Sequence, residues 1–342
     1  MSRRLKFPYH AIMTIDLGDR LNRTLDAGQA QGLHALVVRR NGQTLLEHYG
    51  AGEDRAWITS LGVVAFGPDT LHDLRSVTKS ITALLYGIAL GRGQAPDPSE
   101  TLLRHFPQYP DLAADPQRAR LTVEHALTMS LGLEWKEDPP YDSPANAEIA
   151  MELAPDRYRF VLERPIVEEP GVQWTYCGGA TALLGHLISA GTGRPLPEFA
   201  REVLFEPLGI HNFEWMAGMD GVASPASGLR TAAPDLATIG ELVLADGQWH
   251  GRQIIPAGWI GTMLEPRLAT QWGGRYGYQW YVEESAGHPW VAGMGNGGQR
   301  VIVIPDLGLV AAILAGNYDD PEQWRTPATL LEDVILPAFG DR

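Results

Sequence analysis

The segment R-S-V-T-K-S-I-T-A-L-L-Y-G-I-A-L, residues 75–90, holds one of only three lysines in a chain of 342 residues. Its apolar positions 81, 84, 85 and 88 recur at helical spacing, and glycines at 91 and 93 follow. The sequence therefore predicts a buried helix that begins near Ser76 and carries Lys79 in its first turn. A lysine in so apolar a helix is costly unless it has a partner or a task.

Ser76 and Lys79 lie three residues apart, so their side chains share one face of this helix. Serine becomes a nucleophile when a base takes its proton, and a lysine amine can do so if burial and the positive helix N-terminus favour its neutral form. Free backbone N–H groups at that terminus can stabilise an oxyanion. The pair suits acyl-enzyme chemistry, although S-x-x-K also occurs by chance where the serine is a cap and the lysine is solvated.

A second motif, W-T-Y-C-G-G-A-T at 174–181, places Tyr176 just before another helical pattern. An ammonium favours the ionised form of a nearby phenol, so Tyr176 can shuttle a proton between Ser76 and a leaving group. The alternative is a packed aromatic with a satisfied hydroxyl. Cys177 is the single cysteine, which excludes an internal disulfide, and it is expected to be a buried thiol because no recognisable histidine partner accompanies it.

A third motif, V-A-G-M-G-N-G-G-Q-R at 291–300, has glycines at 293, 295, 297 and 298 around a predicted strand. Such a strand lets a substrate lie against the backbone, and an N–H at its edge can serve as a second oxyanion donor. The alternative is a glycine-rich hairpin without a ligand. The spacing does not match a dinucleotide-binding fingerprint, so no nucleotide cofactor is indicated.

Both ends of the chain show strand patterns. Residues 33–40 and 44–49 are joined by Asn41-Gly42, the strongest short signal for a hairpin. Three or four further strands are expected within 276–314, including one over Y-G-Y-Q-W-Y-V at 276–282, with P-D-L-G at 305–308 as the turn between the last two. Strands at both ends favour one antiparallel sheet that the two ends build together.

Between these ends, from about 96 to 230, helical patterns are short and separated by proline or glycine. Further helices are expected at about 234–246 and 321–338. We therefore predict an α+β fold, with an antiparallel sheet flanked by helices and an inserted, mostly helical lobe. The predicted domains are a discontinuous sheet lobe of 1–95 and 231–342, and a helical lobe of 96–230.

The composition is that of a globular protein, with 44% hydrophobic and 20% charged residues. A formal net charge of −14 argues against nucleic-acid or anionic-membrane partners, because both need clustered cations. The N-terminal apolar run A-I-M-T-I at 11–15 is too short for a secretory signal and Asp16 closes it, so a cytoplasmic location is expected. Neither a cofactor nor a metal is expected, and the oligomeric state stays open.

The serine–lysine helix, the tyrosine motif and the glycine-rich strand, in this order, resemble the serine β-lactamase and penicillin-binding protein superfamily. Within it, the chain resembles the class C β-lactamase-related branch, which includes esterases and 6-aminohexanoate-dimer hydrolases. The resemblance extends from about 70 to 318. It is carried by L-R-S-V-T-K-S-I-T-A, L-T-V-E-H-A-L-T-M-S-L-G-L-E-W, E-P-G-V-Q-W-T-Y-C-G-G-A-T-A-L-L-G, L-F-E-P-L-G-I, A-S-G-L-R-T-A-A-P-D-L-A, Y-G-Y-Q-W and G-N-G-G-Q-R-V-I-V-I-P-D-L-G-L-V.

This resemblance implies a β-lactamase-like fold and a serine hydrolase. Ser76 would be the acylated nucleophile, Lys79 its proton acceptor or relay, and Tyr176 the general acid and base. The stretch Gly293-Met294-Gly295 would stand where the family carries Lys-Thr-Gly or His-Thr-Gly. The amides of Ser76 and Asn296 would then form the oxyanion hole.

Two departures from the family pattern bear on the substrate. Gly178 stands where the Tyr-x-Asn motif has an amide that binds a substrate carbonyl and steadies the lysine. No lysine follows position 136, so the cation that grips a β-lactam or peptide carboxylate is missing, and Arg300 or Arg275 is left as an open replacement.

We therefore expect a small acyl substrate, an ester or a linear amide of the 6-aminohexanoate type. The alternatives are a β-lactamase or D-amino-acid peptidase and, from another class, a catalytically silent ligand-binding relative. His125 and His186 are expected to be core histidines. Four aromatics are left as either pocket wall or core, namely Trp135, Tyr141, Trp174 and Trp290.

Overall fold

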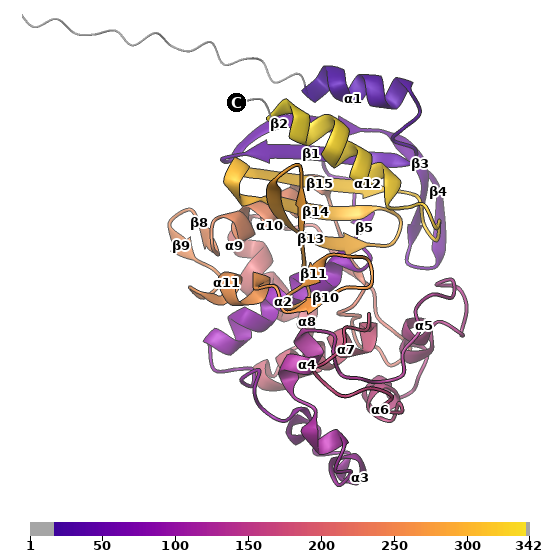
Figure 1. Ribbon diagram of the computed structural model, residues 1–342, viewed down its shortest axis with the longest axis vertical. Helices are drawn as coiled ribbons and strands as arrows, with labels where there is room; N and C mark the ends of the chain where they lie inside the picture. The colour runs from indigo at the N-terminus through magenta and orange to yellow at the C-terminus, as the bar shows by residue number, and fades with distance from the viewer. Residues whose placement is uncertain (1–16, 340–342) are drawn as a thin grey trace, which may run out of the picture.

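The computed structural model describes residues 17–339, and its centre is an antiparallel eight-stranded sheet (Figure 1). In spatial order the strands are β10 (Leu268–Ala269), β11 (Arg275–Tyr276), β12 (Tyr281–Ser285), β13 (His288–Gly295), β14 (Gln299–Ile304), β15 (Leu309–Ala315), β1 (Leu33–Arg40) and β2 (Gln43–Tyr49). β1 pairs with β15 over most of its length. The prediction that both chain ends build one antiparallel sheet is confirmed.

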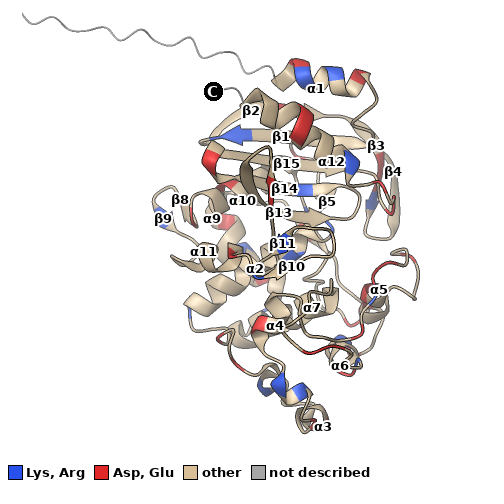
Figure 2. Cartoon of the chain, viewed as in Figure 1, with Lys and Arg blue, Asp and Glu red and all other residues tan. Residues whose placement is uncertain are grey.

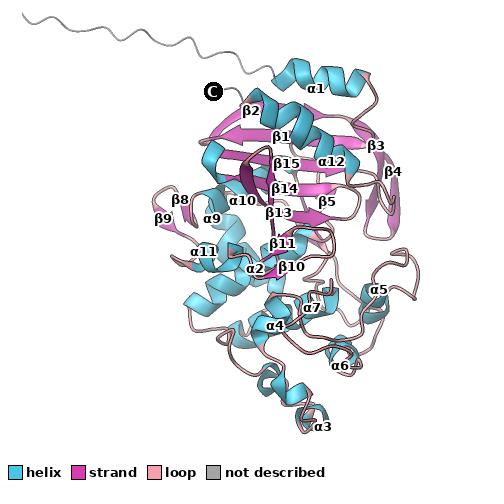
Figure 3. Cartoon of the chain, in the orientation of Figure 1, coloured by secondary structure: helices cyan, strands magenta, loops and turns pink. Residues whose placement is uncertain are grey.

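Helices cover both faces of this sheet (Figure 3). On one face lie α1 (Leu17–Asp26), α12 (Arg325–Thr329) and the π-helical turns Leu330–Ile335 that continue it. On the other face lie α2 (Val77–Gly91) and α10 (Ala233–Leu244). β14 shows why the layers form, because Val301 and Val303 face α10 while Ile302 and Ile304 pack with the terminal helices.

The middle of the chain, from about residue 96 to 230, is mostly helical and lies below α2 in the view of Figure 1. Its helices are α3 (Pro110–Ala113), α4 (Val123–Leu127), α5 (Ala147–Glu152), α6 (Arg157–Leu162), α7 (Gly178–Thr192), α8 (Leu196–Ala200) and α9 (Glu206–Leu208). α7 packs against α2 through one continuous core. The boundaries at 95 and 230 stay a prediction.

Smaller elements complete the described chain. They are β3 (Ala51–Ala56) with β4 (Thr59–Ala65), β5 (His72–Asp73) with β7 (Leu229–Thr231) and β6 (Glu214–Trp215), β8 (Gln248–Trp249) with β9 (Arg252–Gln253), and α11 (Trp259–Leu264). The β3–β4 hairpin was not predicted, because its sequence A-G-E-D-R-A is polar and its residues are largely exposed.

The predicted hairpin at Asn41-Gly42 is confirmed, with both residues at positive φ (47° and 79°). The strand predicted over 276–282 is wrong. Gln279 has a φ of 61°, and its side chain is drawn into the helical layer, where it donates to the carbonyls of Ala126 and Leu127 at 3.0 Å. The predicted strand is therefore interrupted between β11 and β12, where the buried side-chain amide of Gln279 finds its hydrogen-bond acceptors in α4.

No helix within residues 17–339 is long and apolar enough to cross a membrane. The stretch used to predict the location, residues 1–16, lies outside the described residues.

Candidate active site

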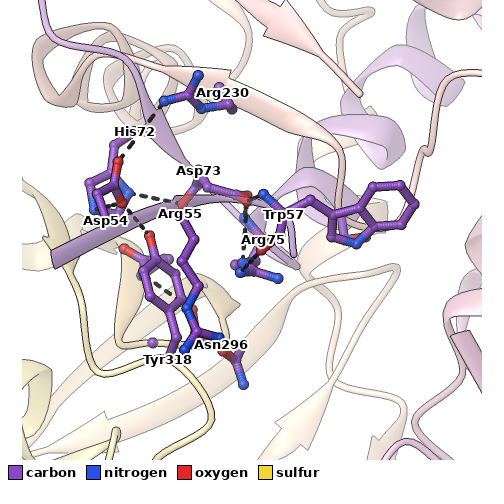
Figure 4. A network of polar contacts seen from close by, with 12 residues as sticks. Asp54, Arg55, Trp57, His72, Asp73, Arg75, Arg230, Asn296 and Tyr318 are labelled. Atoms are coloured by element: carbon purple, nitrogen blue, oxygen red, sulfur yellow. Dashed lines mark hydrogen bonds and ion pairs between the residues drawn. The ribbon is translucent and has the colours of Figure 1, made fainter. Parts of the chain in front are cut away.

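The turn that leads into α2 places Ser76 at its N-terminus. Arg75, one residue earlier, has a φ of 48°, which is unfavourable for a residue with a side chain. Asp73 stabilises this turn, because one carboxylate oxygen accepts from the Arg75 amide at 2.9 Å and the other from the Trp57 amide at 2.6 Å (Figure 4). The strained turn sets the direction of the α2 terminus and of Ser76.

Lys79 lies in the first turn of α2 and is 1% exposed. Its ammonium donates three hydrogen bonds, to Ser76 Oγ at 2.9 Å, to Glu148 Oε2 at 3.1 Å and to the carbonyl of Ala226 at 3.0 Å. The predicted contact between Ser76 and Lys79 is therefore present in the structure. Its three N–H groups are all used, which fixes the lysine in one position.

The charge of Lys79 differs from the expectation. Burial lowers the pKa of Lys79, but the charge of Glu148, with smaller contributions from Tyr176 and Glu137, acts against burial and holds that pKa above its usual value. The lysine is therefore an ammonium in the resting protein, not the neutral amine that the helix terminus alone would favour. The sequence could not predict this, because the carboxylate comes from a helix 69 residues away.

Tyr176 completes the predicted group. Its ring lies over Lys79, with Nζ 4.9 Å from the ring centroid. Burial raises the pKa of Tyr176 to about 12, although the charge of Lys79 opposes this rise. Tyr176 is thus a neutral phenol at rest, able to donate a proton.

Two glutamates, the partly buried Glu137 and the fully buried Glu148, belong to the site and were not predicted from the sequence. Glu137 accepts from the Gly178 amide at 2.5 Å, from the Trp135 indole at 2.6 Å and from the Tyr141 hydroxyl at 3.1 Å. A signal for Glu148 existed in A-N-A-E-I-A at 145–150, where a glutamate follows a helix-capping Asn146 within an apolar helix.

The glycines of the third motif bring β13 against α2. A Cβ on Gly295 would lie 2.5 Å from the carbonyl of Leu74 and 3.1 Å from the amide of Ser76, and one on Gly293 would lie 2.9 Å from Ser80 Oγ. These two glycines therefore allow α2 and β13 to pack closely. The sequence interpretation had assigned them a role in substrate contact.

The two amides expected to bind an oxyanion, those of Ser76 and Asn296, make no hydrogen bond within residues 17–339. Asn296 follows β13 at the start of the turn to β14, and its Oδ1 accepts from the amide of Asp319 at 3.2 Å. A free N–H at each position fits an oxyanion hole.

Arg300 and Arg275, the two candidates for the missing cation, differ in burial and in contacts. Arg300 lies opposite Met294 in the β13–β14 ladder and donates to the carbonyls of Gly295 and Gln299 at 3.2 and 2.7 Å. Burial lowers the pKa of Arg300 to about 10, although Tyr281 and Tyr176 oppose this. Its ladder partner Met294 packs against the aromatic cluster that includes Tyr176. Arg275 is exposed and donates to Arg267.

Aromatic rings form a wall beside Tyr176. Trp174 packs edge-on against Tyr276 and Trp272, at 5.4 and 5.2 Å between centroids, and Trp272 is 6.0 Å from Tyr176. Trp272 is 61% exposed, so this wall is open to solvent. Trp290 packs elsewhere, in the core beneath the terminal helices.

A polar cavity of about 370 Å³ adjoins the site, and both Arg75 and Tyr141 line it. Asp54 and Tyr318 also line this cavity and belong to the network of polar contacts in Figure 4. The Tyr318 hydroxyl donates to Asp54 at 2.8 Å. Arg75 directly precedes Ser76 in the chain, but Ser76, Lys79 and Tyr176 are not among the residues that line this cavity.

A group of potential metal ligands within the described chain consists of His34, Asp54 and His72, whose ligand atoms lie within 4.8 Å of one another. His34 Nδ1 and His72 Nε2 are 3.0 Å apart and share a hydrogen bond, while Asp54 accepts from Tyr318. The two histidines bond to each other, whereas Asp54 Oδ2 has no hydrogen-bond partner within residues 17–339. We assign the cluster a structural role, because it joins β1, β3 and β5.

The remaining candidates from the sequence have structural roles. Cys177 caps α7, and its Sγ accepts from the Ala180 amide at 3.3 Å. Burial raises the pKa of Cys177, so the thiol is inert. His125 closes a capping box on α4, and His186 stacks on Phe106 at 4.5 Å.

Known proteins share both the sequence pattern and the fold. The family model described as Beta-lactamase matches residues 19–333. The chain belongs to the beta-lactamase family. Its site residues Ser76, Lys79 and Tyr176 all lie within the matched range.

Individual relatives of this beta-lactamase-family chain include two hydrolases. A 6-aminohexanoate-dimer hydrolase of Paenarthrobacter ureafaciens is 24% identical over 309 residues, which cover 84% of this chain and 73% of that enzyme. Esterase EstB of Burkholderia gladioli is 29% identical over 153 residues, or 42% of this chain and 38% of the esterase. Among solved structures, EstCE1, described as a hydrolase with promiscuous acyltransferase activity, aligns with a TM-score of 0.75 at 17% identity over 95% of this chain and 100% of EstCE1.

Proposed function

We propose that this chain is a serine hydrolase that acts through an acyl-enzyme on small esters or linear amides. The observation that carries the proposal is the 2.9 Å contact of Lys79 Nζ with Ser76 Oγ beneath the ring of Tyr176. An aliphatic side chain would fill the volume of Lys79 at lower cost, so its burial against a serine serves chemistry better than packing.

In the proposed reaction, Ser76 Oγ attacks the acyl carbon of the substrate while Lys79 and Tyr176 together accept and relay the proton of the serine hydroxyl. The tetrahedral oxyanion is bound by the amides of Ser76 and Asn296. Tyr176 protonates the leaving alcohol or amine as its bond to carbon breaks. Water then attacks the acyl-enzyme by the reverse proton transfers, which releases the acid and restores Ser76.

The substrate proposal follows from the third motif and the aromatic wall. Gly293 replaces the cation that would bind a β-lactam carboxylate, and Trp272 offers an open apolar surface for an acyl chain. Two relatives are named as an esterase and as a 6-aminohexanoate-dimer hydrolase, which supports esters and linear amides over cyclic amides.

A parallel turnover assay tests this proposal with short p-nitrophenyl esters, linear 6-aminohexanoate dimer and a chromogenic cephalosporin. We expect ester turnover to be fastest, cephalosporin turnover to be negligible, and Ser76→Ala to abolish both. Arg300→Met should lower turnover of the dimer, which carries a carboxylate, more than turnover of a neutral ester. Efficient cephalosporin hydrolysis would overturn the substrate proposal.

We also propose a cytoplasmic protein whose partners are small acyl compounds. Figure 2 shows basic and acidic residues interspersed along the described chain, and the formal net charge of −14 supports the exclusion of nucleic acid. Cell fractionation with activity measurement tests the location, and recovery in the periplasmic fraction would contradict it.

A further inference from the structure

The lysine of the site already carries a proton at rest, so it can take the proton of Ser76 only if it passes one of its own to another group. Its three hydrogen-bond acceptors are a hydroxyl, a backbone carbonyl and a carboxylate, from Ser76, Ala226 and Glu148 respectively. Of these, the carboxylate of Glu148 is the strongest base. It lies 3.1 Å from Lys79 Nζ.

Two features position Glu148 for its contact with Lys79, namely its place in α5 and the absence of a side chain at Gly178. It sits in the first turn of α5, whose cap Asn146 accepts from the Glu148 amide at 3.0 Å, and it is fully buried. A Cβ on Gly178 would lie 2.4 Å from Glu148 Oε2. The carboxylate thus fills the space beside Lys79 that any larger residue at 178 would occupy. Its other oxygen, Oε1, has no hydrogen-bond partner within residues 17–339.

We propose that Glu148 is the terminal base of the Ser76–Lys79 relay in this enzyme, an inference that rests on the proposed serine hydrolase function. As the bond from Ser76 Oγ to the acyl carbon forms, the serine O–H breaks and its proton binds Lys79 Nζ. One N–H of Lys79 breaks at the same time, and its proton binds Glu148 Oε2. Lys79 gains one proton and loses one, so it stays an ammonium. Glu148 becomes a neutral carboxylic acid, and the negative charge moves from Glu148 to the oxyanion.

The second glutamate explains which of the two carboxylates is ionised. A Cβ on Gly178 would lie 3.0 Å from Glu137 Oε1 as well, so the two carboxylates are neighbours. Burial, together with the charge of Glu148, raises the pKa of Glu137. Burial also opposes ionisation of Glu148, but the charge of Lys79 and the hydrogen bonds to Glu148 together lower the pKa of Glu148. The titratable groups that face Glu148 are Lys79 on α2, Glu137 and Tyr141 before α5, Glu152 on α5 and Tyr176 before α7.

The first test is the rate at which a fluorophosphonate labels Ser76 in Glu148→Gln, measured from pH 6 to 10. Loss of a general base typically costs 10²–10⁴-fold, so we expect labelling at pH 7 to slow roughly 10²-fold or more. Without its counter-ion, Lys79 loses its proton at lower pH, so labelling by the variant should rise with pH while that of the wild type stays flat. An unchanged rate and pH profile would overturn the proposal.

Relocating the carboxylate distinguishes a base from a hydrogen-bonding partner. In Glu148→Ala, the added change Gly178→Asp brings a carboxylate into the space that Glu148 leaves, while Gly178→Asn brings only an amide. We expect the aspartate pair to recover labelling at pH 7 at least tenfold over Glu148→Ala and the asparagine pair to recover little. Equal recovery by the amide would overturn the role as a base. Circular dichroism and thermal unfolding confirm that each compared variant is folded.

Glu152→Gln is the matched control, because Glu152 is a buried glutamate on the same helix that pairs with Arg157 and not with Lys79. It should label at the wild-type rate, and slowing equal to that of Glu148→Gln would overturn a specific role for Glu148. Wild-type labelling separates the two levels of inference. Absence of any wild-type label contradicts the serine hydrolase itself, whereas a labelled wild type with a fully active Glu148→Gln contradicts only the relay.

Discussion

At the scale of single residues, the sequence predicted which side chains meet but not their protonation. Ser76 and Lys79 are joined by helical spacing, and the superfamily resemblance added Tyr176, which the structure places over Lys79. Glu148 escaped prediction because its contact with Lys79 spans 69 residues and follows no local pattern. The roles of Ser76, Lys79 and Tyr176 in catalysis stay predictions that mutants can test.

Tyr176→Phe removes the phenolic proton but keeps the ring over Lys79. We expect kcat for an ester to fall on the order of 10²-fold or more, because the leaving group loses its proton donor. Tyr276→Phe is the control, since Tyr276 is a buried tyrosine of the same aromatic wall. Steady-state kinetics measures both variants, and near-full activity of Tyr176→Phe would show that another group supplies the proton.

Cys177→Ser should retain activity, because Cys177 caps α7 and serine is a preferred cap residue. The native thiol should also resist a thiol reagent such as DTNB, since it is 5% exposed. Ester turnover and reagent uptake measure these two expectations. A Cys177→Ser protein that is folded but inactive would support Cys177 as the nucleophile.

At the scale of elements, prediction succeeded where a pattern was local and failed where tertiary contacts override it. The Asn41-Gly42 hairpin and the turn at 305–308 formed as expected, because their positive-φ residues fix the backbone. The strand predicted over 276–282 is interrupted at Gln279, whose side chain donates to the carbonyls of Ala126 and Leu127, the last two residues of α4. Glycines 293 and 295 were found by sequence, but their use in helix–strand contact is visible only in the structure.

Gly295→Ala should damage the active site through this contact. The added Cβ would lie 2.5 Å from the Leu74 carbonyl, so β13 must move away from α2 and the two oxyanion amides must separate. We expect an activity loss of at least tenfold together with a lower Tm. Gly261→Ala is the control, because nothing lies within 4 Å of its Cβ position, and alanine favours a helix by up to about 1 kcal/mol. Wild-type activity of Gly295→Ala would contradict the close contact.

At the scale of the whole molecule, the resemblance and the strand patterns predicted the family and the antiparallel sheet, and both are confirmed. The buried network beside the site was not predicted, because His34, Asp54 and His72 come from three separate strands. Each residue looks ordinary in its own strand, and only the pairing of strands brings them together.

The buried network should make stability depend on pH. Burial lowers the pKa of His72 to about 4, although Asp54 opposes this, whereas an unfolded histidine titrates near 6.5. Between these values the unfolded chain binds more protons, so the stability is fully present above pH 6.5 and falls by about 3 kcal/mol as pH drops to 4. Urea unfolding from pH 7.5 to 4.5 should show this slope, and His72→Asn should flatten it. Equal slopes would contradict a buried neutral His72.

The most direct measurement of the central claim is rapid-quench peptide mass spectrometry during turnover of a p-nitrophenyl ester. If Ser76 is the nucleophile, the peptide that contains it gains the mass of the acyl group before steady state, together with a burst of p-nitrophenol close to one per active site. The Ser76→Ala protein should show neither the mass gain nor the burst. Turnover by the wild type with no acylated peptide, or with the acyl group on another residue, would contradict the acyl-enzyme at Ser76.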